Sequence, residues 1–242
     1  MQEIETKLWA KTKRYVRFLQ AVPFLKMVAV CNNLAFGKVN KKSDIDLFIV
    51  AKKNRLFIVR SFVTLFLQIL GVRRHHKNIK ARFCLSFFID EENLDLSKIA
   101  IKNDIYLAYW IKTMIPIIER NVFKNFLEKN KWAEYYFEDK KEFWNNEYKI
   151  LKKSKFLNFS RKIFEIILNR KFGDFIEKSL KKWQIKRAKK KIIYAGDKSS
   201  IIVSDHILKF HNIDRRREYR RLWYRKHGKD LITDERFSRL FP

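Results

Sequence analysis

The segment Met27–Val50, MVAVCNNLAFGKVNKKSDIDLFIV, constrains the fold more than any other part of this chain. It holds two short apolar runs, Met27–Cys31 and Leu47–Val50, separated by a polar stretch. Short apolar runs bounded by polar residues predict buried β-strands. Residues two apart on a strand point to the same face, so Asp44 and Asp46 are expected side by side at the mouth of the second strand. Paired carboxylates in such a place suit a Mg²⁺ ion bound over phosphate groups.

The charge of the chain points to polyanionic partners. Its 242 residues carry 55 Lys and Arg against 26 Asp and Glu, a formal net charge of +29. Such a field attracts nucleic acid, nucleotides or an anionic membrane face. A genomic bias toward Lys, Ile, Asn and Phe is an alternative source of the same charge. A hydrophobic content of 47% excludes a wholly disordered chain, and the length allows one large domain or two small ones.

The two cysteines, Cys31 and Cys84, both lie in apolar stretches. They are expected to be buried and reduced, and the chain has no Cys/His cluster with zinc spacing. The N-terminal residues are charged throughout and lack the apolar core of a secretory signal. We therefore expect a cytoplasmic protein.

Two further segments belong with the predicted strands. Residues 4–20 have the spacing of an amphipathic helix, and Arg82–Ile89 predicts a third strand. Between them, Arg55–Val72 is strongly apolar and approaches membrane-spanning length. Because it contains Arg60 and lies between two predicted strands, a core helix that crosses the sheet is the favoured interpretation.

Beyond about residue 100 the pattern becomes helical. Asp104–Leu127 predicts a helix kinked or split at Pro116, and Ser160–Lys191 predicts a long helix weakened by Gly173. Asp214–His227 predicts an arginine-rich helix, after a break at Gly196–Ser200.

These patterns predict an α+β fold. A small mixed β-sheet from residues of about 24–90 would carry flanking helices, followed by a mostly helical, basic C-terminal region. The change of pattern near residue 100 predicts two domains, residues 1–100 and residues 101–242.

The arrangement of strand, turn, loop and SDIDLFIV resembles the DNA polymerase β-like nucleotidyltransferase superfamily. The residues that match it are Leu34, Ala35, Gly37, Ser43, Asp44, Ile45, Asp46 and Leu47. A weaker resemblance, carried by LKFHNIDRRREYR at Leu208–Arg220, is to uncharacterised bacterial proteins that join this domain to a helical extension. The first resemblance implies transfer of a nucleoside monophosphate from a nucleoside triphosphate to an acceptor, with Mg²⁺ as cofactor. It implies that Asp44 and Asp46 are the catalytic carboxylates and the first two metal ligands.

The chain departs from the superfamily pattern in two places. Asn32 and Asn33 stand where the family has Gly-Ser. We expect them, with Ser43, to bind the nucleotide, since Asn33 can cap the turn and donate an amide hydrogen bond to phosphate. The third carboxylate of the family lies on a neighbouring strand, where this chain offers Ser86 in mid-strand and Asp90 at the end. Asp90 is the candidate third metal ligand, and a site with two carboxylates is the alternative.

Two basic segments are candidates for binding nucleic acid. KRAKKK begins at Lys186 and RRREYRRLWYRK at Arg215, and the aromatics of the second suit stacking on bases. The alternative is a solvated helix whose aromatics face the core. The candidate nucleic-acid-binding residues are Lys186, Arg187, Lys189, Lys190, Arg215, Arg216, Arg217, Arg220 and Arg221.

The function favoured by these patterns is that of a Mg²⁺-dependent nucleotidyltransferase-like protein that uses a nucleoside triphosphate. RNA or another polyanion is the candidate acceptor. The alternative is a catalytically inactive protein of the same fold that binds nucleic acid through its charge. A peripheral membrane protein with basic amphipathic helices is the least favoured interpretation. His206 and His211 are expected to be hydrogen-bonded structural residues.

Overall fold

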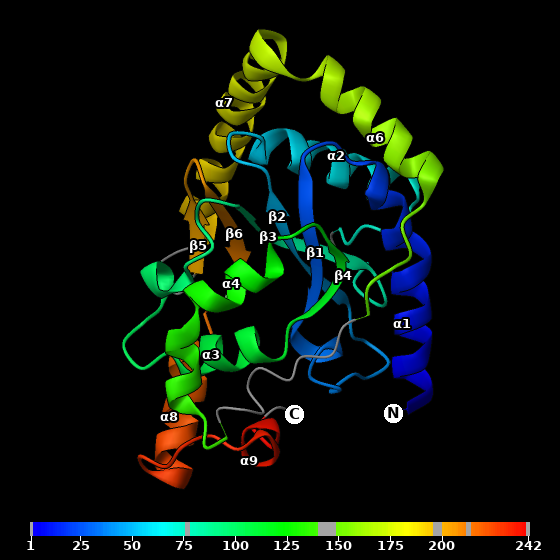
Figure 1. Ribbon diagram of the computed structural model, residues 1–242. Coiled ribbons are helices and arrows are strands. Elements are labelled where there is room, and N and C mark those ends of the chain that lie inside the picture. Colours follow the sequence, from blue (N-terminus) through cyan, green and yellow to red (C-terminus); the bar gives the residue numbers. More distant parts are fainter. Residues whose placement is uncertain (1, 76–77, 140–148, 196–199, 212–213, 241–242) are drawn as a thin grey trace.

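The computed structural model describes residues 2–75, 78–139, 149–195, 200–211 and 214–240 (Figure 1). Within them the chain forms an α+β fold around a six-stranded mixed sheet of order β4-β1-β2-β3-β6-β5. The strands are β1 (Leu25–Cys31), β2 (Ile45–Ala51), β3 (Phe83–Asp90), β4 (Ile115–Glu119), β5 (Ser200–Val203) and β6 (Ile207–His211).

Helices cover both faces of this sheet. The α-helices are α1 (Gln2–Val16), α2 (Leu56–Ile69), α3 (Ile105–Lys112), α4 (Phe123–Lys129), α6 (Lys155–Ile167), α7 (Arg170–Ala195), α8 (Arg216–His227) and α9 (Asp234–Ser238). Short 3₁₀ turns are η1 (Arg17–Ala21), η2 (Asn32–Leu34), η3 (Leu96–Ile99) and η4 (Lys131–Tyr136).

The pairing of β2 with β3 is parallel, while all other described strand pairs are antiparallel. A parallel pair needs a long crossover connection, and α2 supplies it. This explains the apolar sequence of Arg55–Val72: Phe57, Ile58, Val63 and Leu67 of α2 are buried against the sheet. The prediction of a core helix is confirmed. Among the described residues, a search for helices with the length and hydropathy to cross a bilayer finds none.

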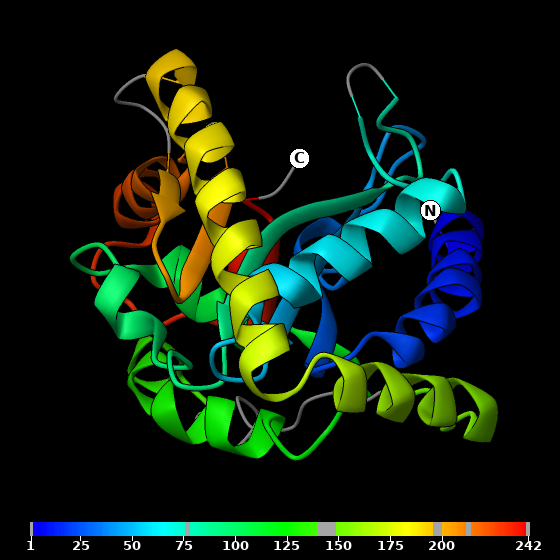
Figure 2. The same ribbon diagram turned by 90° about the horizontal axis from the view of Figure 1, so that it is seen from above.

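The alternation along the strands separates two apolar cores. Val28 and Ile49 face the core formed with α1 and α2, whereas Ala29 and Phe48 face the core formed with α3, α4, α8 and α9. Helix α7 crosses α2 on the first face (Figure 2). The two cores fix both faces of β2, and therefore its register.

The predicted helix Asp104–Leu127 is wrong in its second half. Helix α3 ends at Lys112, and Ile115–Glu119 forms β4, which pairs with β1 at the edge of the sheet. Proline lacks a backbone N–H and is accommodated on edge strands, so Pro116 fits this place. The helical pattern is thus split at the proline, as one of the two expected outcomes, but the proline itself lies in a strand between α3 and α4.

The predicted single helix Ser160–Lys191 is two helices. Helix α6 ends at Ile167 and α7 starts at Arg170, and the two meet at a sharp corner (Figure 1). A Cβ added to Gly173 would lie 1.7 Å from the carbonyl oxygen of Leu168. The glycine is thus required for this close approach of backbone to backbone.

The predicted division at residue 100 does not separate two bodies. Strands β4, β5 and β6 come from the part of the chain beyond residue 100 and join the same sheet at both of its edges. The region beyond residue 100 is mostly helical, as predicted, but its strands make it part of the same sheet. The predicted break at Gly196–Ser200 falls on residues 196–199, which lie outside the described residues.

Strand β6 carries a buried lysine. Lys209 is 6% exposed, and its Nζ lies 5.9 Å from the ring centroid of Phe87. Burial, and then the charge of Arg216, lower the pKa of Lys209 to about 8, although the carboxylates of Asp214 and Asp104 act in the opposite direction. The ammonium is consequently destabilising in the folded protein near neutral pH.

We expect Lys209→Met to raise the free energy of unfolding near pH 7 by up to about 3 kcal/mol, because the ordinary lysine pKa is about 10.4. The unfolded chain binds more protons than the folded chain between these two pKa values, so wild-type stability gains with rising pH. The advantage of the variant should therefore shrink between about pH 8 and pH 10. Urea unfolding of both proteins across this range measures it. A stability difference that does not change with pH would contradict the expectation.

Candidate functional site

The predicted acid pair lies at the start of β2. Asp44 immediately precedes the strand and Asp46 is its second residue. Parallel register places Cys84 of β3 beside Asp46. One ligand atom from each of Asp44, Asp46 and Cys84 lies within 4.8 Å of the others. The structure brings the two carboxylates together, as the spacing of the sequence predicts.

The electrostatics of this cluster favour a hard cation. Burial, and then the charge of Asp44, raise the pKa of Asp46 to about 7, while Asn32, Cys84 and Arg74 act in the opposite direction. Burial beside the two carboxylates also raises the pKa of the Cys84 thiol far above its ordinary value. The thiol thus stays neutral and is a poor ligand. Two carboxylates remain, which fits Mg²⁺, because this ion keeps several waters and often takes only one or two protein carboxylates.

An arginine competes with a cation for this place. Arg74 Nη1 lies 2.6 Å from Asp44 Oδ2, and a backbone hydrogen bond from Arg74 N to Phe83 O, 2.9 Å long, ties the residue to β3. The Arg74 side chain is 40% exposed, so this ion pair contributes at most about 1 kcal/mol. A bound divalent cation can displace it. Arg74 was not predicted as a site residue, because it lies in an irregular basic loop.

The two asparagines take different roles. Asn32 has φ +57, in the left-handed region that glycine favours and that asparagine tolerates. Its side chain bonds the Asp46 carboxylate, and its Oδ1 lies 3.5 Å from the hydroxyl of Tyr106. Asn33 is exposed, and its carbonyl oxygen accepts a hydrogen bond from Lys38 N. The structure therefore places Asn32 directly at the acid pair.

Ser43, which we predict to bind the nucleotide, is a buried residue of the polar loop before β2. It is 7% exposed, and its Oγ accepts a hydrogen bond of 2.9 Å from Asn40 N. Its carbonyl oxygen accepts another from Ala81 N. Because the hydroxyl and backbone hold the polar loop against the start of β3, Ser43 shapes the loop and is not presented to a nucleotide.

The prediction of Asp90 as third metal ligand is wrong. Asp90 pairs with Ala51, at the opposite end of the parallel strands from Asp46 and Cys84. It is 1% exposed, and its Oδ2 lies 2.7 Å from His206 Nδ1. Parallel strands bring their starts together, so a residue at the end of β3 cannot reach the start of β2. The hydrogen-bonded role expected of His206 is confirmed, whereas the His211 side chain lies outside the described part of the structure.

The arginine-rich helix uses part of its charge internally. Arg216 is buried, with Nη1 3.2 Å from Asp104 and Nη2 2.7 Å from Asp214, so it is not a nucleic-acid-binding residue as predicted. Tyr219 and Trp223 are 6% and 1% exposed. Their rings face the core and are not available to stack on bases. The structure therefore shows the alternative, a helix whose aromatics are part of the core.

The other basic candidates are mostly at the surface. Arg220 donates to the Lys102 carbonyl, and Arg187 lies over the ring of Trp183, with 5.1 Å between Cζ and the ring centroid. The Lys190 side chain lies outside the described residues. The exposed candidates are Lys186, Arg187, Lys189, Arg215, Arg217 and Arg221.

Comparisons of the chain with known protein families, curated proteins and solved structures find no match. The class that the coordinates define is an α+β protein with a six-stranded mixed sheet. At the start of its central parallel strand pair lies a carboxylate pair that suits a divalent cation.

Proposed function

We propose that this protein is a Mg²⁺-dependent nucleotidyltransferase-like protein that transfers a nucleoside monophosphate from a nucleoside triphosphate to an acceptor. The observation that carries the proposal is the clustering of Asp44, Asp46 and Cys84 within 4.8 Å at the start of β2. Asp44 and Asp46 would hold the cation, which supplies charge neutralisation at the triphosphate and polarisation of the acceptor oxygen. The Asn32 amide, which lies beside Asp46, would contact a phosphate.

The net charge of +29 supports a polyanionic acceptor such as RNA. Exposed Lys186, Lys189, Arg217 and Arg221 would contact its backbone. The cytoplasm, where nucleoside triphosphates and Mg²⁺ are abundant, is the compartment we propose. The free thiols of Cys31 and Cys84 are consistent with that compartment.

Replacing both carboxylates tests the proposal. We expect Asp44→Ala with Asp46→Ala to weaken binding of each Mg²⁺-loaded nucleoside triphosphate by about tenfold or more, because the cation loses its protein ligands. Calorimetric titration measures the affinity, and circular dichroism verifies that the variant is folded. Glu128→Ala with Glu218→Ala, at two exposed acids, is the control with the same change of charge. Unchanged Mg²⁺-dependent binding in the acid-pair variant would refute the proposal.

A second candidate is a catalytically inactive protein of this fold that binds nucleic acid. It is favoured by the ion pair of Arg74 with Asp44 Oδ2, which takes a place that a cation would need. The neutral Cys84 thiol, which stands in place of a third carboxylate, also favours it. This candidate predicts affinity for a labelled RNA that falls steeply with salt and is the same in wild type and the acid-pair variant.

A further inference from the structure

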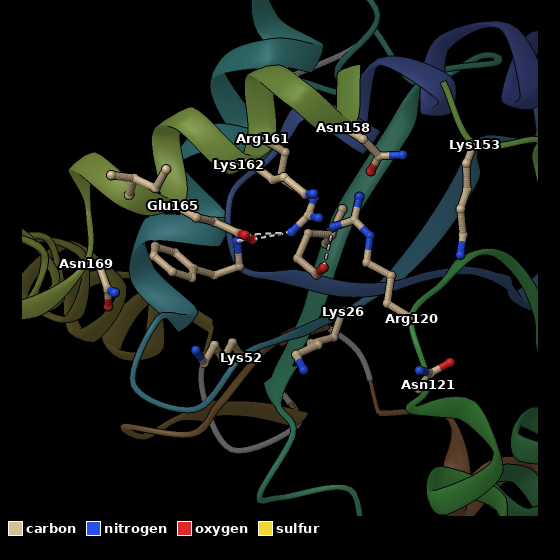
Figure 3. Close-up of a pocket in the computed structure, with 13 residues that line it drawn as sticks. Lys26, Lys52, Arg120, Asn121, Lys153, Asn158, Arg161, Lys162, Glu165 and Asn169 are labelled. Carbon is tan, nitrogen blue, oxygen red and sulfur yellow. Dashed lines mark hydrogen bonds and ion pairs between the residues drawn. The ribbon is translucent and has the colours of Figure 1, made fainter. Parts of the chain in front are cut away.

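A concave site lies at the end of β1 and β2 away from the acid pair. It is a cavity of about 820 Å³ between the sheet and α6 (Figure 3). Leu25 at this end pairs with Ala51, whereas Cys31 pairs with Asp46. Six residues of extended strand separate the two ends, roughly 20 Å. A single nucleotide bound at the acid pair would not fill this cavity.

The lining of the cavity is strongly cationic. Its basic side chains come from four separate parts of the chain and are Lys26, Lys52, Arg120, Lys153, Arg161 and Lys162. Its acidic member is Glu165. Glu165 Oε1 already accepts hydrogen bonds from Phe24 N at 2.9 Å and from Arg161 Nη1 at 2.6 Å. Lys26 is also paired, since its Nζ lies 2.9 Å from Glu91 Oε2 outside the lining. Six cations against these two carboxylates leave an excess of four positive charges around the cavity.

Two of these cations are guanidinium groups held close together. Arg120 donates to the carbonyl oxygens of Leu25 at 2.6 Å and Gln20 at 2.9 Å, which fixes its side chain. Burial, and then the charge of Arg161, lower the pKa of Arg120 to about 10. Arg161 Nε is buried and has no hydrogen-bond partner among the described residues. An anion between the two guanidinium groups would offset their electrostatic repulsion and accept hydrogen bonds from their remaining N–H groups.

Helix α6 is oriented to line this cavity. Asn158, Arg161, Lys162 and Glu165 recur at helical spacing and face the cavity, as Figure 3 shows. On the other side of the helix, Phe156 is 74% exposed, and Phe159, Ile163 and Ile167 are also exposed. Surface helices usually turn their apolar face inward. Because α6 presents this polar face inward instead, burial of apolar surface does not explain the charged lining.

We propose that this cavity binds a compact, multiply charged phosphate anion, the polyphosphate group of a small ligand. Arginine forks bind phosphate oxygens in pairs and lysines bind them as point charges, and both kinds converge here on one hollow. The volume is that of a small-molecule site. A free polyphosphate, such as that of a nucleotide, and the phosphorylated headgroup of a lipid share this chemistry. The lipid headgroup is tested as well, because the exposed apolar side of α6 is suited to contact with a membrane.

The test uses inorganic tripolyphosphate in buffer with EDTA, so that no cation bridges it to the acid pair. Calorimetry should show binding to wild type, and Lys52→Met with Lys162→Met should weaken it by about tenfold or more. Lys155→Met with Lys171→Met removes two exposed lysines outside the cavity lining and should change the affinity less than about twofold. Equal losses in the two variants, or no binding to wild type, would overturn the proposal.

Further arms identify the source of the phosphate. ATP without Mg²⁺, and phosphatidylcholine vesicles with or without a bisphosphorylated inositol lipid, are titrated against the same variants. Loss of either interaction in the cavity variant alone supports the proposal and names the source. An RNA oligonucleotide that requires Lys52 and Lys162, with no tripolyphosphate binding, would overturn it in favour of a nucleic-acid surface. The acid-pair variant should bind tripolyphosphate like wild type, so this proposal can fail or succeed independently of nucleotidyl transfer.

Discussion

Replacing Arg216 by alanine is expected to lower the free energy of unfolding by about 3–5 kcal/mol, the usual effect of removing one partner of a buried ion pair. Arg216 Nη1 lies 3.2 Å from the carboxylate of Asp104, which is 1% exposed. Asp104 also accepts hydrogen bonds from Leu107 N and Ile101 N and so caps α3. Without Arg216, this capping carboxylate would be buried with no guanidinium against it.

Urea unfolding followed by circular dichroism measures the loss. Arg217→Ala removes the same side chain from the next, exposed position of α8 and should change stability by less than about 0.5 kcal/mol. The pair of variants also separates structure from nucleic-acid binding, because only Arg217 is available to a ligand. An Arg216→Ala protein as stable as wild type would show that the ion pair is not needed.

Replacing Glu177 by alanine is expected to lower the free energy of unfolding by about 2–4 kcal/mol. Two buried N–H groups would lose their acceptor, and the start of α2 would lose a favourable negative charge. Glu177 is 8% exposed on α7. Its two carboxylate oxygens accept hydrogen bonds from Phe57 N at 2.9 Å and Ile58 N at 2.8 Å, in the first turn of α2. Burial raises the pKa of this carboxyl, while Arg55 and the two backbone donors lower it in part.

Hydrogen exchange gives the local readout for this variant. The amides of Phe57 and Ile58 should exchange faster in Glu177→Ala, and urea unfolding should report the global loss. Lys178→Ala, at the adjacent exposed position, is the matched control and should leave both measurements unchanged. Unaltered protection of these two amides would mean that α2 does not depend on the cap from α7.

The central part of the fold could be predicted from local patterns. The spacing of Asp44 and Asp46 and the apolar run of Arg55–Val72 report short-range geometry, and the structure agrees with both. That Cys84 is the third member of the cluster could not be predicted, because its place depends on the register of the strands. Cys84 reaches Asp46 only because β3 runs parallel to β2.

The edges of the sheet were missed for a similar reason. Strand β4 contains Pro116, and β5 and β6 are short, so none of them has a strong periodic signal. Strands β4 and β6 pair with β1 and β3, which are far away in the chain, and β5 extends the sheet by pairing with its neighbour β6. The basic cavity has no local signal either, since Lys26, Arg120 and Arg161 come together only in the folded chain.

The way the sheet is assembled limits how the protein can be shortened. A fragment that stops at residue 100 would keep β1, β2 and β3 but lose β4 and β6, their outer neighbours. Both flanks would then present unpaired backbone groups on apolar strands, which is a template for self-association. We therefore expect such a fragment to aggregate through its exposed strand edges instead of folding as a smaller protein.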